Sequence, residues 1–228
     1  MRIAIAIATR GNDIYAKLLH FCCESVKKYQ CEIITSESGF SAEQAQTNLF
    51  NYITDSGPDY VLLIDSDVAV PYDTLEKLLA CKTDIVSAPV WHYCPESNDI
   101  HLNIHYDMLP GGKDFKRVYE TKPSGVEEVI STSFACLLLS KNVFEVFHKA
   151  GESFFTWSPL IDDNWNKRVS DNIFCLKARK LGFRIFTCWE VKGAIHNRAV
   201  KVCDQLITHF YAHCPMHKCS TVIIENKQ

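Results

Sequence analysis

The segment from Asp59 to Val70, which reads DYVLLIDSDVAV, decides the fold that we expect. Its first half, Tyr60 to Ile64, is an unbroken apolar run rich in β-branched and aromatic residues, which indicates a buried strand. A Gly-Pro pair before the run and a proline after the segment favour a short strand over a helix. Asp65 and Asp67 then stand at the carboxyl end of this strand, where ligands bind in open α/β sheets.

Two carboxylates one residue apart indicate a site for a hard divalent cation. Mg²⁺ and Mn²⁺ prefer oxygen ligands, and their coordination is commonly completed by substrate phosphates. The alternative is that Asp65 caps a turn and Asp67 is solvated, which is the commoner fate of an arbitrary Asp-x-Asp pair. The apolar strand directly before the pair favours the metal interpretation.

Length and composition are those of an ordinary globular protein. The chain has 228 residues, of which 47% are hydrophobic and 22% charged, enough for one sizeable α/β domain. A net charge of −3 without a block of Lys or Arg argues against nucleic acid as the main partner. We expect no membrane span and no secretory signal, because the apolar run Ile3 to Ala8 is too short for either. The eleven cysteines are then read as reduced thiols of a cytoplasmic protein.

Strands and helices alternate over the first ninety residues. This alternation predicts a largely parallel central sheet with helices on both faces. The expected strands lie at 2–8, 31–35, 60–64 and 84–88, and the expected helices at 14–29, at 41–53 and from 73 onward.

The second half predicts a smaller mixed or antiparallel part. Residues 89–125 are polar and turn-rich, with no clear period, and predict loops with a short hairpin. Residues 151–169 predict a long surface loop, and loops of that length are often functional lids. The remaining expected elements are strands at 126–130, 134–139 and 184–189 and helices at 142–149 and 171–181.

Four features, in this order along the chain, resemble the family 2 glycosyltransferases of the GT-A fold. Tyr60 to Asp67 is similar to their Asp-x-Asp element, and Ala45 to Asn48 to an upstream Ala-Arg-Asn element, with Thr47 in place of Arg. Together the four features extend the resemblance over residues 2–197.

The other two features lie near the end of this span. Ser170 to Ala178 is close to the family's Glu-Asp-x-x-Phe-Cys-x-x-Ala pattern, with Ser170 in place of Glu. Gly193 to His196 occupies the place of a late histidine that contacts the metal or the diphosphate. Each feature alone is weak, and the order of all four is the specific signal.

The resemblance implies a metal-dependent transferase with a single GT-A-like domain over residues 1–228. It would move a sugar from a UDP- or GDP-sugar to a hydroxyl of a glycan or other acceptor. Residues 1–90 would bind the nucleotide sugar, residues 91–200 would bind the acceptor and carry the catalytic base, and residues 201–228 would form a C-terminal tail.

The resemblance also implies roles for single residues. Asp67, with Asp65 and His196, would hold Mn²⁺ or Mg²⁺, and Asp171 would be the general base, which predicts inversion at the anomeric carbon. The residues expected to contact the donor are Thr9, Arg10, Asn48, Asp65, Ser66 and Trp91.

Alternatives remain for two of these residues. An Asp in the first turn of a helix is favoured by the helix dipole alone, which would explain Asp171 without catalysis. A lone histidine beside an apolar strand is more often a buried residue bonded to the backbone, which would explain His196.

Two other functions also remain open. A sugar-1-phosphate nucleotidyltransferase would need a Gly-rich phosphate loop after the first strand, and residues 9–13 are a poor version of one. The other is a binding module for sugar nucleotides or glycans that has kept the fold and lost the chemistry.

The C-terminal tail is dense in soft metal ligands. It predicts either a structural zinc site or an amphipathic helix followed by a β-like segment at 221–224. The residues concerned are Cys203, His209, His213, Cys214, His217 and Cys219.

Overall fold

The structure is a computed structural model that describes residues 1–9, 14–37, 42–94, 98–108, 115–154 and 170–196. The description is of the backbone alone at residues 8, 9, 36, 37, 42–48, 94 and 170. Arg10 and the cysteines and histidines of the C-terminal tail therefore lie outside the described residues.

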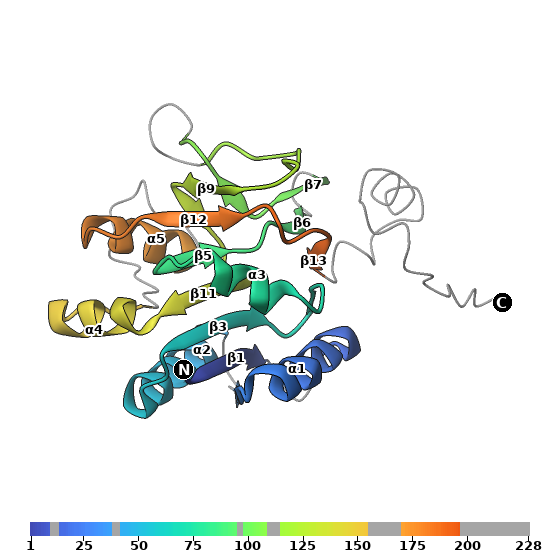
Figure 1. The fold of residues 1–228 in the computed structure, drawn as a ribbon. Coiled ribbons are helices and arrows are strands. Elements are labelled where there is room, and N and C mark those ends of the chain that lie inside the picture. The colour runs from blue at the N-terminus through green and yellow to red at the C-terminus, as the bar shows by residue number, and fades with distance from the viewer. Residues whose placement is uncertain (10–13, 38–41, 95–97, 109–114, 155–169, 197–228) are drawn as a thin grey trace.

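A seven-stranded sheet forms the centre of the molecule (Figure 1). Its strands, from one edge to the other, are β2 (Glu32–Glu37), β1 (Ile3–Thr9), β3 (Tyr60–Asp65), β11 (Cys136–Ser140), β5 (Ile85–Ser87), β12 (Ile185–Cys188) and β9 (Val126–Val129). Strands β1, β2, β3, β5 and β12 point the same way, whereas β11 and β9 run in the opposite direction. The prediction of a largely parallel sheet is confirmed.

Helices cover both faces of this sheet, as predicted. Helices α1 (Ala16–Tyr29) and α3 (Thr74–Ala80) pack on one face, and α2 (Ala42–Ser56), α4 (Lys141–Ala150) and α5 (Ser170–Lys180) on the other. Strand β3 supplies both cores, because alternate side chains of a strand point to opposite faces: Leu62 and Ile64 face α1 and α3, while Val61 and Leu63 face the other helices. Each such side chain contributes about 1.5–3 kcal/mol by leaving water.

Residues 90–105 are more regular than the sequence predicted. The expected hairpin is present as β6 (Val90–Cys94) and β7 (Asp99–Leu102), in a four-stranded sheet with β13 (Ala194–His196) and β4 (Val68–Ala69). The chain then continues into β8 (Ile104–His105), which pairs with β10 (Ser131–Thr132). We call these two small sheets, β4-β13-β6-β7 and β8-β10, the second layer. The second layer lies at the carboxyl end of β3, because β4 directly follows that strand and residues of β6, β7 and β8 line a pocket with Asp65.

Phe154 corrects the prediction that residues 151–169 form only a surface loop. Its side chain is 1% exposed and lies in an aromatic cluster, with ring centroids 3.8 Å from Phe50, 4.3 Å from Phe147 and 5.1 Å from Phe174. The prediction is therefore wrong at the start of the segment, because an apolar ring of this size is stabilised by burial between α2, α4 and α5. Residues 155–169 lie outside the described ranges.

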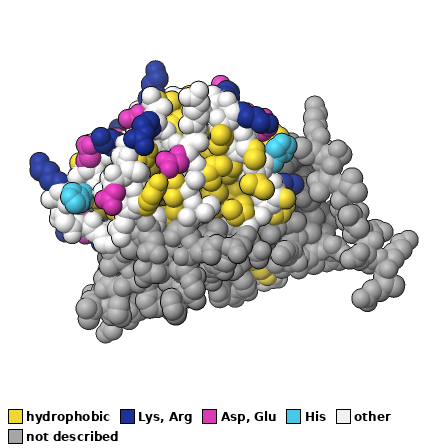
Figure 2. All heavy atoms as spheres, turned by 90° about the horizontal axis from the view of Figure 1, so that it is seen from below, with side chains coloured by type: hydrophobic (Ala, Val, Ile, Leu, Met, Phe, Trp, Pro, Cys, Tyr) yellow, Lys and Arg dark blue, Asp and Glu magenta, His cyan; other side chains and the backbone are white. Residues whose placement is uncertain are grey.

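The described surface mixes charges of both signs. Figure 2 shows apolar side chains gathered in one area of the lower face, with Lys, Arg, Asp and Glu interspersed around them. Among the described helices, none combines the length and apolarity needed to cross a bilayer. The cysteines whose side chains are described are all free thiols: Cys22, Cys23, Cys31, Cys81, Cys136, Cys175 and Cys188.

Candidate functional site

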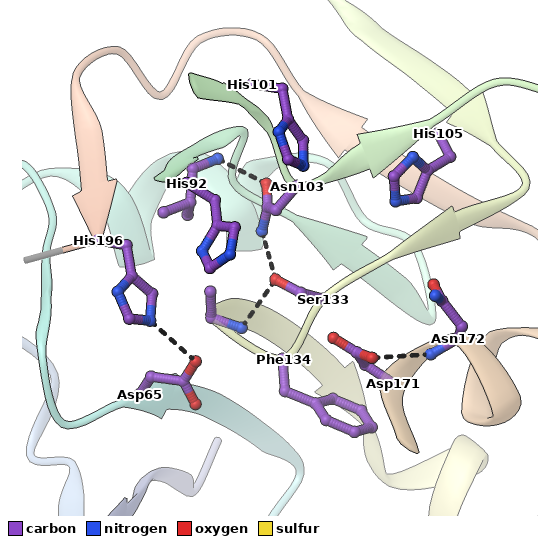
Figure 3. Close-up of a pocket in the computed structure, with 12 residues that line it drawn as sticks. Asp65, His92, His101, Asn103, His105, Ser133, Phe134, Asp171, Asn172 and His196 are labelled. Carbon is purple, nitrogen blue, oxygen red and sulfur yellow. Dashed lines mark hydrogen bonds and ion pairs between the residues drawn. The ribbon is translucent and has the colours of Figure 1, made fainter. Parts of the chain in front are cut away.

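A pocket of about 330 Å³ lies at the carboxyl end of β3, between the central sheet and the second layer (Figure 3). Its acidic side carries Asp65, Asp171 and His196. Facing them are His92, His101 and His105, which we call the imidazole wall. This volume is at the lower end of the range for small-molecule sites, about 300–1,000 Å³.

The Asp65–Asp67 turn is fixed by backbone hydrogen bonds. The Asp65 N–H donates to the carbonyl of Ala135 at 3.3 Å, and the Ser66 carbonyl accepts the N–H of Tyr15 at 2.8 Å. The turn therefore presents both carboxylates at the rim of the sheet, where each is about one-third exposed.

His196 is brought to this turn by strand pairing. Strand β13 runs antiparallel to β4, which directly follows the turn, with His196 in register with Val68. The Nε2 atom of His196 lies 3.2 Å from Oδ1 of Asp67 and 3.9 Å from Oδ2 of Asp65. The structure thus brings together the three residues predicted to hold a metal ion.

Two carboxylates and one imidazole fit Mn²⁺ or Mg²⁺ as a partial ligand set, since such ions keep waters and take phosphate oxygens. Among the described residues, however, no group of three His, Cys, Asp or Glu side chains has the spacing of a formed metal site. Asp67 borders the pocket without belonging to its described lining. The arrangement is therefore a candidate site that a diphosphate would complete.

Asp171 lies in the first turn of α5 and lines the same pocket. Its Oδ1 accepts the backbone N–H of Asn172 at 3.0 Å. Burial raises the pKa of Asp171 to about 6, against the opposite effect of backbone N–H groups of Asn172, Asp171 and Phe134. A carboxylate with a pKa near neutrality is suited to take up a proton.

The amino-terminal end of α5 is anchored to β10. The Cys175 thiol donates to the carbonyl of Thr132 at 3.4 Å and accepts its N–H at the same distance. The Ser131 hydroxyl donates to Oδ1 of Asn172. These contacts fix the start of the helix, and with it the position of Asp171.

The imidazole wall was missed in the sequence, although its pattern is visible there. His101, Asn103 and His105 alternate with Leu102 and Ile104, whose side chains are fully buried in the core. This period of two is typical of strands with one polar face. Because the run is short and passes from one sheet to another at Asn103, its alternation does not stand out from the turn-rich sequence around it.

Asn103 ties the second layer together. Its Oδ1 accepts the N–H of Val90 at 2.7 Å and its Nδ2 donates to Oγ of Ser133 at 2.6 Å. Its backbone also bonds both neighbours, through its N–H to Val90 and its carbonyl to Ser133. With 7% of its surface exposed, Asn103 serves to fix the wall.

The residues predicted to contact the donor have different places in the structure. Trp91 packs against core residues, outside the described pocket lining, while its neighbour His92 lines the pocket. Thr9 ends β1 and Asn48 lies in α2, both described by backbone alone. Their contacts with a donor stay predictions.

No protein-family model matches the chain, and no curated protein matches it either. Among solved structures, the chain is similar to A197 from STIV, with 14% identity over 86% of this chain and 85% of A197, at a TM-score of 0.53. This comparison shows a shared fold.

Two glycosyltransferase structures match at lower TM-scores. The first is the catalytic domain of Drosophila β1,4-galactosyltransferase 7 in complex with xylobiose, with 13% identity over 85% of this chain and 67% of that chain, at a TM-score of 0.45. The second is GalNAc-T7 with UDP, GalNAc and Mn²⁺, with 11% identity over 85% of this chain and 43% of that chain, at a TM-score of 0.47. Of these three neighbours, A197 has the TM-score that supports a common fold, and at 14% identity it shows no more than the fold.

Proposed function

We propose that the chain is a metal-dependent glycosyltransferase that moves a sugar from a nucleotide-diphosphate sugar to an acceptor hydroxyl with inversion. The observation that supports this most strongly is that Asp65, Asp67 and His196 come together beside the pocket that Asp171 also lines. The residues come from separate parts of the chain, and each was expected at this site. In this proposal residues 1–90 bind the donor and residues 91–200 supply the acceptor site and the base.

At one end of the pocket, Asp65, Asp67 and His196 would hold Mn²⁺ or Mg²⁺ against the donor diphosphate. Such an ion is a Lewis acid that neutralises the charge growing on the leaving phosphate. The three side chains would thereby position the diphosphate of a UDP- or GDP-sugar.

At the other end, Asp171 would remove the proton of the acceptor hydroxyl. With its pKa near 6, the group is mostly a carboxylate at pH 7 and is still basic enough to accept a proton. The oxygen of the acceptor then attacks the anomeric carbon from the face opposite the leaving group. One displacement with one base inverts the configuration.

A thermal-shift experiment tests the donor site. The wild type, Asp67→Ala and Asp55→Ala are heated with uridine, guanosine and thymidine diphosphates and their sugars, with and without Mn²⁺. Asp55 is the matched control, because it is an exposed carboxylate on α2. At a ligand concentration of 100 Kd, binding to the native state stabilises it by about 2.7 kcal/mol.

We expect a metal-dependent shift with one nucleotide in the wild type and in Asp55→Ala, and none in Asp67→Ala. If no nucleotide shifts the unfolding temperature of the wild type, the proposal is overturned. Binding without transfer or donor hydrolysis would favour the binding module. Release of diphosphate from a nucleoside triphosphate and a sugar 1-phosphate would favour the nucleotidyltransferase.

A further inference from the structure

Two cysteines outside the pocket share one backbone acceptor. Cys81 directly follows α3, and Cys188 ends β12. The carbonyl oxygen of Lys77 accepts a hydrogen bond from the Cys81 thiol at 3.2 Å and from the Cys188 thiol at 3.8 Å. We propose that Cys81 and Cys188 are a reversible oxidation site, at which a hydroperoxide joins the two sulfur atoms in a disulfide bond. Such a site would act whether or not the chain transfers sugars.

The end of α3 gives a reason why the two thiols converge. The last carbonyl groups of a helix lack partners within the helix, and side-chain donors or a tighter turn can satisfy them. The turn tightens here, because the N–H of Cys81 bonds the carbonyl of Leu78 at 3.2 Å. The carbonyl of Lys77, in the same turn, accepts both thiols. One acceptor thus draws sulfur atoms from two elements to one point.

The two sulfur atoms are close enough to be joined. The thiols hydrogen-bond to each other, and both are free in the structure. From such a contact the sulfur atoms need to approach by only about 2 Å to reach the S–S length of a disulfide, about 2.05 Å. Cys188 is fully buried, whereas Cys81 is partly exposed at the end of a helix. Cys81 can therefore supply most of this movement.

Cys188 is the more acidic thiol of the pair. The hydrogen bond from Cys81 lowers its pKa to about 7, together with the backbone N–H groups of Glu190 and Val191 and against the effects of burial and of the Glu190 charge. The same hydrogen bond, followed by burial, raises the pKa of Cys81. In contrast, burial raises the pKa of Cys136 to about 12. Because the thiolate is the nucleophile, Cys188 is the thiol suited to attack an oxidant.

The oxidation would proceed in two steps, with hydrogen peroxide as the oxidant. The Cys188 thiolate attacks one oxygen, so that an S–O bond forms, the O–O bond breaks, and hydroxide leaves and takes a proton from solvent. The sulfur of Cys81 then attacks the sulfenic acid: an S–S bond forms, the S–O bond breaks, and water leaves with the thiol proton. Two electrons pass from the sulfur atoms to the peroxide. A dithiol returns them by thiol–disulfide exchange.

The disulfide would connect α3 to the segment that leads to β13. After Cys188 the chain passes through residues 189–193 to this strand. Val191 of the segment lies in the same core cluster as Leu75 and Leu78 of α3. The bond would therefore reinforce a contact that packing already makes. Because it closes a loop of about 100 residues, it should stabilise the folded state.

Peptide mapping of the oxidised chain tests the proposal. The reduced wild type, Cys81→Ser, Cys188→Ser and Cys23→Ser are treated with hydrogen peroxide in the folded state, and the remaining thiols are alkylated before proteolysis and mass spectrometry. Serine keeps a donor for the Lys77 carbonyl and cannot form the bridge, which separates bonding from packing. Cys23→Ser is the control, because Cys23 is an exposed thiol on α1. Thermal unfolding of the oxidised and reduced proteins is measured in parallel.

We expect a bridge between Cys81 and Cys188 in the wild type and in Cys23→Ser, which dithiothreitol reverses. The bridge should raise the unfolding temperature by about 5–15 °C. In Cys81→Ser, dimedone should label Cys188, because its sulfenic acid has lost the thiol that resolves it.

The peptide map of the wild type decides the matter even if a serine variant does not fold. A bridge from Cys81 or Cys188 to a different cysteine would overturn the assignment, and so would an unbridged pair after the other thiols have been oxidised. A lower unfolding temperature of the bridged protein would also overturn it, because the folded state would then oppose the bond. Zinc that protects both thiols from peroxide would replace the oxidation site by a metal site.

Discussion

The two sides of the pocket differ in how they are built. The acidic side stands at the ends of elements that pack into the core: Asp65 ends β3, and Asp171 lies in the first turn of α5. The imidazole wall stands on short strands of the second layer, whose backbone changes sheet at Asn103. Reactive groups at the ends of core elements are thus easier to predict than groups on a short covering layer.

The largest effect that separates the two sides should come from Asp171→Asn. If Asp171 is the base, transfer should fall by about 10²- to 10⁴-fold, because the acceptor hydroxyl loses its proton acceptor. Donor binding should remain, since the amide occupies the same space. Rates are measured as nucleoside diphosphate release with acceptor present.

Asp55→Asn is the matched control, an exposed Asp-to-Asn change on α2. It should leave transfer within a factor of about two, because exposed substitutions change little. Retained transfer in Asp171→Asn would show that Asp171 is not the catalytic base. Its position in the first turn of α5 would then be explained by the favourable interaction of an Asp with the helix dipole.

Asn103→Ala should disturb the imidazole wall rather than the acidic side. The change removes the acceptor of the Val90 N–H and the donor to Ser133, both at a buried position. A buried group left unbonded costs about 1–3 kcal/mol. The free energy of unfolding from urea titration should fall by that amount. The affinity for the acceptor should weaken more than the affinity for the donor.

Asn142→Ala provides the comparison, because Asn142 is exposed and bonds Asp84 at 3.3 Å. It should change stability by less than about 0.5 kcal/mol. A stability loss in Asn103→Ala no larger than this control would show that Asn103 does not fix the wall.

The sequence predicted the central sheet and the acidic side because both follow from strong local patterns. The apolar run of β3 bounded by proline, and Asp171 at a helix start, are each visible within about ten residues. The wall depends on pairing between β8 and β10, which are far apart in the sequence, and on the hydrogen bonds of Asn103 to Val90 and Ser133. Phe154 was missed for a similar reason, since its core partners come from α2, α4 and α5.

The pH dependence of stability tests the environment of the acidic side. Because burial raises the pKa of Asp171 to about 6, the folded state binds this proton more tightly than the unfolded chain does. The stabilising contribution is present below about pH 4 and is lost as the pH rises through 6. Asp171→Asn should therefore gain stability relative to the wild type between pH 4 and pH 7.5, by about 1–3 kcal/mol.

Urea titrations of both proteins at the two pH values measure this gain. A stability difference that does not change with pH would mean that Asp171 is solvated, contrary to its place in the pocket. The ionisation of Asp171, with its pKa near 6, also predicts that the transfer rate rises with pH up to about 6, as the base loses its proton.

The smallest expected effect is at the link between the two sides. Ser131→Ala removes the hydroxyl that bonds Asn172, while the pairing of Ser131 with His105 is retained through the backbone. Loss of one such bond costs about 0.5–1.5 kcal/mol. Ser25→Ala is the control, a buried serine whose hydroxyl makes no hydrogen bond to the described residues, and it should be nearly neutral.

If Ser131 positions the base, the loosened Asn172 N–H stabilises the Asp171 carboxylate less, and the rising limb of the rate against pH should move to higher pH. A loss of stability with an unmoved limb would make Ser131 a packing residue and leave the two sides independent.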